Sequence, residues 1–150
     1  MTGPLNHAWA SDARSGRQIW HYPRQLPTGV KVCCGMVNRG FAAYGDRLFM
    51  GTLDAHFVAL EMKTGKVIYD VEMAAAKDGF AATGAPLVVN GKVIAGVAGG
   101  EFANRGFLDA YNPATGQRLR RFYTVPAPRE AGSDSWKGED WPRGGGPPWL

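Results

Sequence analysis

The chain has 150 residues, 45% of them hydrophobic and 20% charged, which predicts one folded domain rather than a disordered segment. Its net charge of +4 is scattered instead of forming a Lys/Arg tract interleaved with aromatic residues, so nucleic-acid binding is not expected. No apolar run reaches the ~18 residues that a membrane span requires. No signal peptide is recognisable, and the two cysteines lack the spacing of a zinc site.

A turn motif recurs three times in the chain, at intervals of roughly fifty residues. Each copy has an apolar strand, a polar turn that ends in Ser/Thr–Gly, and a second strand. The three turn glycines, which supply the positive φ of such turns, are Gly16, Gly65 and Gly116. An aromatic residue closes the first two copies, and we expect Trp20 and Tyr69 each to pack against a neighbouring unit. Arg120 takes this position in the third copy, where that contact is lost or altered.

Runs rich in Val, Ile, Leu and Phe lie around these turns and predict strands. Residues 1–22 are expected to form the closing half of a four-stranded unit. The next unit spans about 41–71, with predicted strands at 41–44, 47–52, 56–60 and 67–71. Another spans about 85–123, with predicted strands at 85–89, 92–97, 107–111 and 118–123. Residues 124–150 are expected to form a truncated tail, and residues 73–77 are expected to form at most one helical turn.

Four-stranded units that repeat at this interval are typical of β-propeller blades, of which about four to eight close a ring. The sequence therefore predicts an all-β fold of four-stranded antiparallel blades. Two complete units and half of another are too few for a ring, so we expect a fragment or a truncated copy of a larger propeller.

Cys33 and Cys34 are adjacent, and the chain has no other cysteines. Neighbouring Cα atoms are ~3.8 Å apart, whereas disulfides ordinarily span ~4.4–6.8 Å, so a bond between these two would close a strained ring. Strain of this kind usually marks a functional site. Spacing alone favours two free, half-buried thiols and leaves the strained ring as the alternative.

Several motifs together resemble the pyrroloquinoline quinone-dependent (quinoprotein) alcohol dehydrogenases. The repeated turn is similar to their tryptophan-docking motif, and residues 33–40 are similar to their adjacent-cysteine segment. Residues 96–107 resemble their cofactor segment. The resemblance covers essentially the whole chain but only the early blades of that family. It implies a propeller of about eight blades that binds the quinone and a divalent metal, usually calcium, and it leaves a lanthanide open.

The resemblance also implies which residues contact the quinone. Cys33 and Cys34 would form a disulfide that packs on one quinone face, and the flat indole of Trp136 would pack on the other. Arg39 would pair with quinone oxygens through its planar fork. The full implied set is Cys33, Cys34, Arg39, Thr83, Ala98, Gly99, Gly100 and Trp136. The alternatives are a Trp136 that packs a blade and an Arg39 that lies on the surface after a turn.

Glu101 matches the metal-binding glutamate of the family, and the alternative is a solvated glutamate in a hairpin. Calcium takes about six to eight oxygen ligands, some of which the quinone can supply. The family's second metal ligand and its catalytic base match no residue of this chain, so no catalytic residue is assigned. Asp54 and Asp109 lie in predicted strands and turns and are not taken as the base.

The implied activity is oxidation of a primary alcohol to an aldehyde, with hydride transfer to the quinone. The family also implies a periplasmic location and a cytochrome c-type electron acceptor. Because the chain matches only part of the family's site, little or no activity is expected from it alone. Two other hypotheses stay open: a non-catalytic propeller that serves as a scaffold or binding module, and an inactive truncated remnant.

Overall fold

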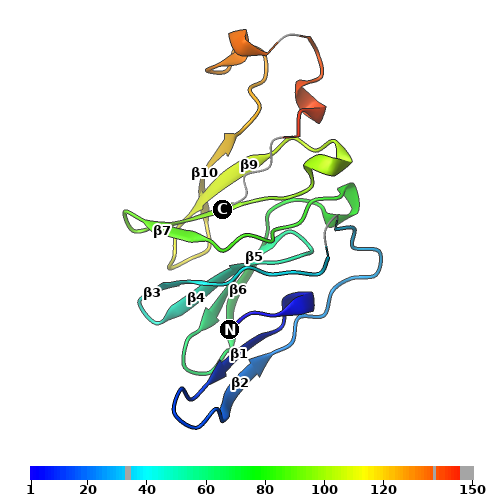
Figure 1. Cartoon of the computed structure of the whole chain (residues 1–150). Coiled ribbons are helices and arrows are strands. Elements are labelled where there is room, and N and C mark those ends of the chain that lie inside the picture. Colours follow the sequence, from blue (N-terminus) through cyan, green and yellow to red (C-terminus); the bar gives the residue numbers. More distant parts are fainter. Residues whose placement is uncertain (33–34, 137, 146–150) are drawn as a thin grey trace.

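The computed structural model describes residues 1–32, 35–136 and 138–145. These residues form β-strands and short 3-10 helices, and none of them lies in an α-helix. The strands make three antiparallel sheets, which follow one another along the chain (Figure 1). Within the described ranges, no helix is long and apolar enough to cross a membrane.

The first sheet pairs β1 (Ala8–Ser11) with β2 (Gln18–Tyr22). The second sheet has the order β3-β4-β5-β6, with bounds Ala42–Tyr44, Arg47–Gly51, His56–Glu61 and Val67–Glu72. The third has the order β7-β8-β9-β10, with bounds Leu87–Val89, Lys92–Gly96, Phe107–Tyr111 and Arg118–Tyr123. The 3-10 helices are η1 (Pro4–Asn6), η2 (Ala76–Asp78), η3 (Gly100–Phe102), η4 (Ser133–Ser135) and η5 (Trp141–Arg143).

The predicted strands are confirmed, since the observed ones begin and end within two residues of the expected positions. The largest shift is at β7, which begins at Leu87 instead of residue 85. Pro86 precedes it and has no backbone N–H to donate to a strand ladder. The expected helical turn is η2, which begins at Ala76. The division of the chain into blade domains stays a prediction.

The hydrophobic core lies between the faces of consecutive sheets. Phe57 of β5 stacks on Tyr111 of β9, with ring centroids 4.2 Å apart, and Phe49 of β4 stacks on Phe57 at 5.8 Å. On the opposite side of the second sheet, Met50 and Val58 pack with Trp20 of the first sheet. Each sheet thus buries apolar side chains against the next, and burial of one such side chain contributes about 1.5–3 kcal/mol.

The aromatic residues that close the first two turn motifs each pack on the next copy of the turn, as the repeat predicted. A Cβ atom built on Gly65 would lie 2.6 Å from the Trp20 ring, and one built on Gly116 would lie 2.7 Å from the Tyr69 ring. Both glycines have positive φ values, 71° and 73°. Only glycine therefore suits these two positions, for its backbone conformation and for its lack of a side chain.

Candidate functional site

Three connections between strands meet at one pocket, and they lie at the same end of the antiparallel sheets. They join β2 to β3, β6 to β7, and β8 to β9. The residues that line the pocket are Lys31, Val32, Gly35, Val37 and Arg39 from the first connection, Gly79, Ala81 and Thr83 from the second, and Ala98, Gly99, Glu101 and Phe102 from the third. The fold therefore brings together stretches of sequence that lie far apart along the chain.

Five of the residues expected at a cofactor site line this pocket: Arg39, Thr83, Ala98, Gly99 and Glu101. Gly100 belongs to η3 together with Glu101 but is not one of the lining residues. Cys33 and Cys34 lie outside the described residues. The described residues on either side of them, Val32 and Gly35, both line the pocket.

Trp136 lies in a different hollow, in the segment that follows β10. That hollow is lined by Pro126, Pro128, Arg129, Ser133, Gly138 and Trp141 as well as Trp136. The Trp136 residue is 38% exposed and is not brought together with Arg39 and Glu101. Its expected contact with a quinone face stays a prediction to which the described residues add no support.

Backbone hydrogen bonds hold the three connections side by side. The N–H of Arg39 donates to the carbonyl oxygen of Thr83 at 3.0 Å. Ala98 donates to Ala81 at 2.6 Å, and Ala81 donates back to Ala98 at 3.2 Å. The β6–β7 connection thus lies between the β2–β3 and β8–β9 connections at the pocket.

Two glycines allow the second and third connections to approach each other closely. Gly79 and Gly99 have φ values of 87° and 121°, which residues other than glycine rarely adopt. A Cβ atom built on Gly99 would collide with the carbonyl oxygen of Gly79, and one built on Gly79 would lie 2.8 Å from Phe102. Where these two connections meet, backbone therefore lies directly against backbone and against the ring of Phe102, and the missing side chains leave room for close approach of a flat ligand.

The charged groups at the pocket are two cations and one carboxylate. Lys31 and Arg39 suit a ligand that carries several carboxylates, and the hydroxyl of Thr83 can donate or accept a hydrogen bond. The carboxylate of Glu101 could supply oxygen ligands to a hard divalent cation. Among the described residues, no group of three or more His, Cys, Asp and Glu could hold a metal ion. A metal at this pocket would take only one carboxylate from the described residues.

Seven of the twelve pocket-lining residues were not among the expected site residues: Lys31, Val32, Gly35, Val37, Gly79, Ala81 and Phe102. A signal for Lys31 was present, because it stands two residues before the paired cysteines in the sequence. Phe102 directly follows Glu101 in η3. Gly79 gave no signal, since glycines are frequent in this chain and its role depends on a contact with another connection.

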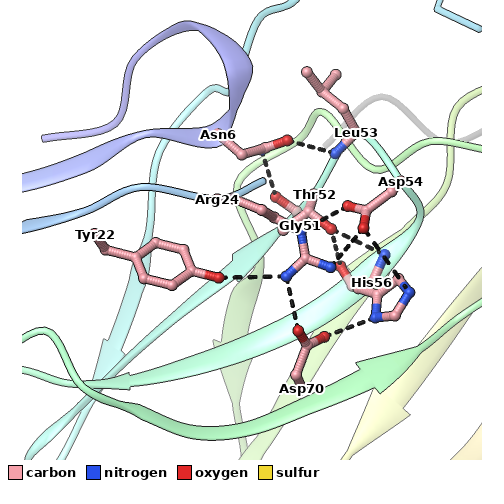
Figure 2. Close-up of polar contacts among 9 residues, drawn as sticks. All are labelled: Asn6, Tyr22, Arg24, Gly51, Thr52, Leu53, Asp54, His56 and Asp70. Atoms are coloured by element: carbon pink, nitrogen blue, oxygen red, sulfur yellow. Dashed lines mark hydrogen bonds and ion pairs between the residues drawn. The ribbon is translucent and has the colours of Figure 1, made fainter. Parts of the chain in front are cut away.

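A second cluster of charged residues, away from the pocket-lining set, is built around Arg24 (Figure 2). Arg24 donates to both carboxylate oxygens of Asp54, at 2.8 and 2.6 Å, and to Asp70 at 2.8 Å. His56 contacts Asp70 at 2.7 Å through Nδ1. Burial acts to raise the pKa of Asp54, but the hydrogen bonds from Arg24 and Thr52 and the charge of Arg24 together outweigh it and hold this pKa below its usual value.

Asp109 is engaged in the same manner in the third sheet. Its carboxylate accepts hydrogen bonds from Arg121 at 2.7 and 2.6 Å and from the hydroxyl of Tyr111 at 2.9 Å. Arg121 also donates to the carbonyl oxygen of Met73 at 2.8 Å, which links the third sheet to the end of β6. Asp54 and Asp109 are therefore each held in a structural ion pair with an arginine, and neither lines the pocket.

We next compared the chain with known proteins. The family model described as "PQQ: Glucose/ethanol/alcohol dehydrogenase, beta-propeller domain" matches residues 1–150. The chain is 41% identical to the quinoprotein alcohol dehydrogenase PedH of Pseudomonas putida, over 100% of this chain and 28% of that protein. It is 37% identical to 1-butanol dehydrogenase (quinone) of Thauera butanivorans, over 99% of this chain and 28% of that protein.

A solved structure of a europium-containing methanol dehydrogenase superposes on the chain with a TM-score of 0.88 and 34% sequence identity. The superposition covers 98% of this chain and 29% of that one. The sheets are therefore blades of a β-propeller, and the fold class predicted from the repeat is confirmed. The chain spans less than a third of the length of these relatives.

Proposed function

Because the chain belongs to the quinoprotein alcohol dehydrogenase family, we propose that it forms part of the active site of an enzyme that oxidises a primary alcohol to an aldehyde. In this reaction the hydride passes to bound pyrroloquinoline quinone. The observation that carries the proposal is the convergence of Arg39, Thr83 and Glu101 on one pocket from three separate connections. Since the chain spans 28% of PedH, the reaction is proposed for the whole enzyme.

The pocket has the chemistry that this cofactor needs. Pyrroloquinoline quinone is flat and carries several carboxylates, and when bound it supplies two-electron redox chemistry. Arg39 would pair with its oxygens through two N–H groups, and Thr83 would add a hydrogen bond. Ala98, Gly99 and Gly100 would let the backbone approach the edge of the ring system.

The two faces of the quinone are assigned to residues whose roles stay proposals. Cys33 and Cys34 would form a strained disulfide that packs on one face, which the pocket positions of Val32 and Gly35 support. Trp136 would pack on the other face, as the family resemblance implies. An oxidising compartment would favour the disulfide.

Glu101 would hold the metal through its carboxylate, together with oxygens from the quinone and from elsewhere in the enzyme. The ion would act as a Lewis acid. Calcium is the metal that we propose first, because the family resemblance implies it. A lanthanide is the second candidate, because two relatives are named as europium-containing and lanthanide-dependent methanol dehydrogenases. The proton acceptor is expected elsewhere in the enzyme.

A small primary alcohol is the proposed substrate, because relatives are named for methanol, ethanol and 1-butanol. The family resemblance alone supports a periplasmic location and a cytochrome c-type electron acceptor. These two assignments do not depend on any contact in the pocket.

The test is a quinone titration of the intact protein, with Ca²⁺ or La³⁺ present and followed by calorimetry. Arg39→Met should weaken quinone binding about tenfold or more, since hydrogen bonds to charged groups contribute about 1.5–3 kcal/mol. Glu101→Gln should remove the dependence of binding on metal. Arg118→Met is the control, because Arg118 lies at the far end of the third sheet and is half-exposed.

The same titration separates the alternative functions. A protein that binds no quinone but folds normally would favour a scaffold or binding module. BamB of Moraxella catarrhalis has a TM-score of 0.60 with 19% identity, which shows a shared fold and nothing further. A whole enzyme that binds quinone without any turnover in a dye-linked alcohol assay would favour an inactive remnant.

A further inference from the structure

We infer that Asn104 and Arg105 are positioning residues for Glu101, because their side chains tie the loop that carries Glu101 to the segments on both of its sides. The inference rests on the proposed function, since it takes Glu101 as a metal ligand. Neither residue lines the pocket itself. They follow Glu101 by three and four positions, at the end of the β8–β9 connection.

Asn104 ties the loop to the preceding connection. Its Nδ2 group donates to the carbonyl oxygen of Asp78, the last residue of η2, at 2.9 Å. Phe102 packs against Gly79, the residue after Asp78, so closely that a Cβ atom at position 79 would not fit. The side chain of Asn104 thereby fixes the distance between η2 and η3, and Glu101 lies in η3.

Arg105 ties the loop to the segment that follows β10. Its Nε group donates to the carbonyl oxygen of Val125 at 2.7 Å, and its terminal nitrogen forms an ion pair with Glu130. The Arg105 side chain is only 13% exposed. These two bonds run in different directions from one guanidinium group, so they restrict both its position and its orientation.

Aromatic rings hold the same guanidinium group. Its central carbon lies 3.7 Å from the ring centroid of Tyr123 and 4.7 Å from that of Trp141. Tyr123 ends β10, and Trp141 begins η5. Arg105 is therefore in contact with the beginning, the middle and the end of the described part of the tail segment.

The backbone beside Arg105 completes the connection. Arg105 and Gly145 form a parallel bridge, and the N–H of Gly106 donates to the carbonyl oxygen of Gly145 at 2.9 Å. A Cβ atom built on Gly145 would lie 3.7 Å from the carbonyl oxygen of Gly100. The tail thus returns to contact the residue directly before Glu101.

These ties matter because η3 is short and Glu101 is exposed. The loop leaves η3 through Ala103, whose φ of 61° is unfavourable for a residue with a side chain. A metal ligand must be held within about 0.5 Å of its position to bind well. Asn104 supplies this restraint through η2, which precedes the loop in the sequence, and Arg105 supplies it through the tail, which follows the loop.

The experiment compares Asn104→Ala and Arg105→Lys with the wild type in the intact protein. Lysine keeps the charge but loses the planar fork and the stacking, so a purely electrostatic role would survive this change. Hydrogen exchange of backbone amides, measured without cofactor, reports the ties directly. Affinity for Tb³⁺ or Ca²⁺, measured by calorimetry, reports their effect on Glu101. Arg118→Lys is the matched control.

We expect faster exchange in residues 99–106 for both variants, and in residues 126–136 for Arg105→Lys only. Metal affinity should fall about tenfold or more, as when groups behind a metal ligand are removed, while quinone affinity without metal stays unchanged. Wild-type metal affinity in both variants would overturn the inference, even with faster exchange. If Arg105→Lys does not fold, Asn104→Ala carries the test. Failure of the wild type to bind metal would instead refute the role of Glu101, and the exchange data would still report the ties.

Discussion

The indole of Trp20 lies against Gly65, in the space where any other residue would place its side chain. The indole N–H donates to the carbonyl oxygen of Met62 in the same turn, at 3.0 Å. Tyr69 makes the equivalent contact one blade later. Its ring lies on Gly116, and its hydroxyl donates to the carbonyl oxygen of Pro113 at 3.1 Å. An aromatic side chain from each blade thus fixes the position of the turn in the next one.

Gly65→Ala should destabilise the protein more than Gly16→Ala. Both glycines have nearly the same φ, 71° and 72°, so the conformational strain of about 1–2 kcal/mol is common to both variants. Only Gly65 has a neighbour within 4 Å of an added Cβ atom, and that neighbour is Trp20. Overpacking should add about 1–3 kcal/mol to the destabilisation of Gly65→Ala. Urea unfolding of the two variants measures the difference, and equal midpoints would contradict the close contact.

Arg24→Met should destabilise the protein by about 3–5 kcal/mol at neutral pH, because it leaves the buried carboxylate of Asp54 without its partner. The side chains of Arg24 and Asp54 are each 7% exposed. Arg17→Met is the control, since Arg17 lies on the exposed hairpin between β1 and β2. Thermal unfolding of both variants against the wild type measures the effect. A similar change in both would show that the ion pair is not the cause.

The same pair predicts how stability depends on acid. The pKa of Asp54 lies below its usual value of 3.8 in the folded protein, because the effect of burial is outweighed by the bonds and charge of Arg24 together with a hydrogen bond from Thr52. A lowered pKa contributes stability that is present above pH 3.8 and is lost as the pH falls through the folded pKa. Arg24→Met removes the bonds, so its free energy of unfolding should fall less steeply below that pH. Parallel acid titrations of unfolding, followed by circular dichroism, test this.

Tyr69 predicts a loss of stability in alkali. Burial raises the pKa of its phenol from 10.0 to about 12, against a smaller opposing effect of Arg47. Because the folded pKa is raised, the contribution is present below pH 10 and disappears as the pH rises towards 12. Tyr69→Phe should lose this part of the alkaline decline, while Tyr44→Phe, at a half-exposed tyrosine, should keep it. Unfolding midpoints across this range decide, and identical profiles for all three proteins would contradict the prediction.

The strands and the docking of Trp20 and Tyr69 could be predicted because they depend on short patterns. Alternating apolar runs and a Ser/Thr–Gly turn determine hairpins locally, and the interval between copies indicates how the units stack. The pocket positions of Arg39, Thr83 and Glu101 followed from motifs of the family in their order along the chain. Their convergence could be predicted from the order of the blades, without knowing the conformation of the individual loops.

The positions that sequence did not reveal lie in connections whose shape depends on tertiary contacts. Trp136 lies in a tail that Arg105 holds, in a hollow that it shares with Trp141, and its expected contact with the quinone stays a prediction. No local pattern indicates that Asn104 reaches Asp78, because this bond joins two different connections. Loops of this kind are specified by partners that are distant in sequence, and composition does not identify those partners.

Lys31→Met should weaken binding of the quinone by about two- to fivefold, in a manner that salt reduces. Lys31 lines the pocket beside Arg39, but it is exposed, and exposed ion pairs contribute about 0.2–1 kcal/mol and are screened by salt. Lys66→Met makes the same change of charge in the turn between β5 and β6, at the opposite end of the sheet, and should leave affinity unchanged. Calorimetric titrations at low and high salt measure both. An equal loss in the two variants would mean that net charge matters and that Lys31 makes no specific contact, whereas a loss confined to Lys31→Met would add this residue to the groups that bind the cofactor carboxylates.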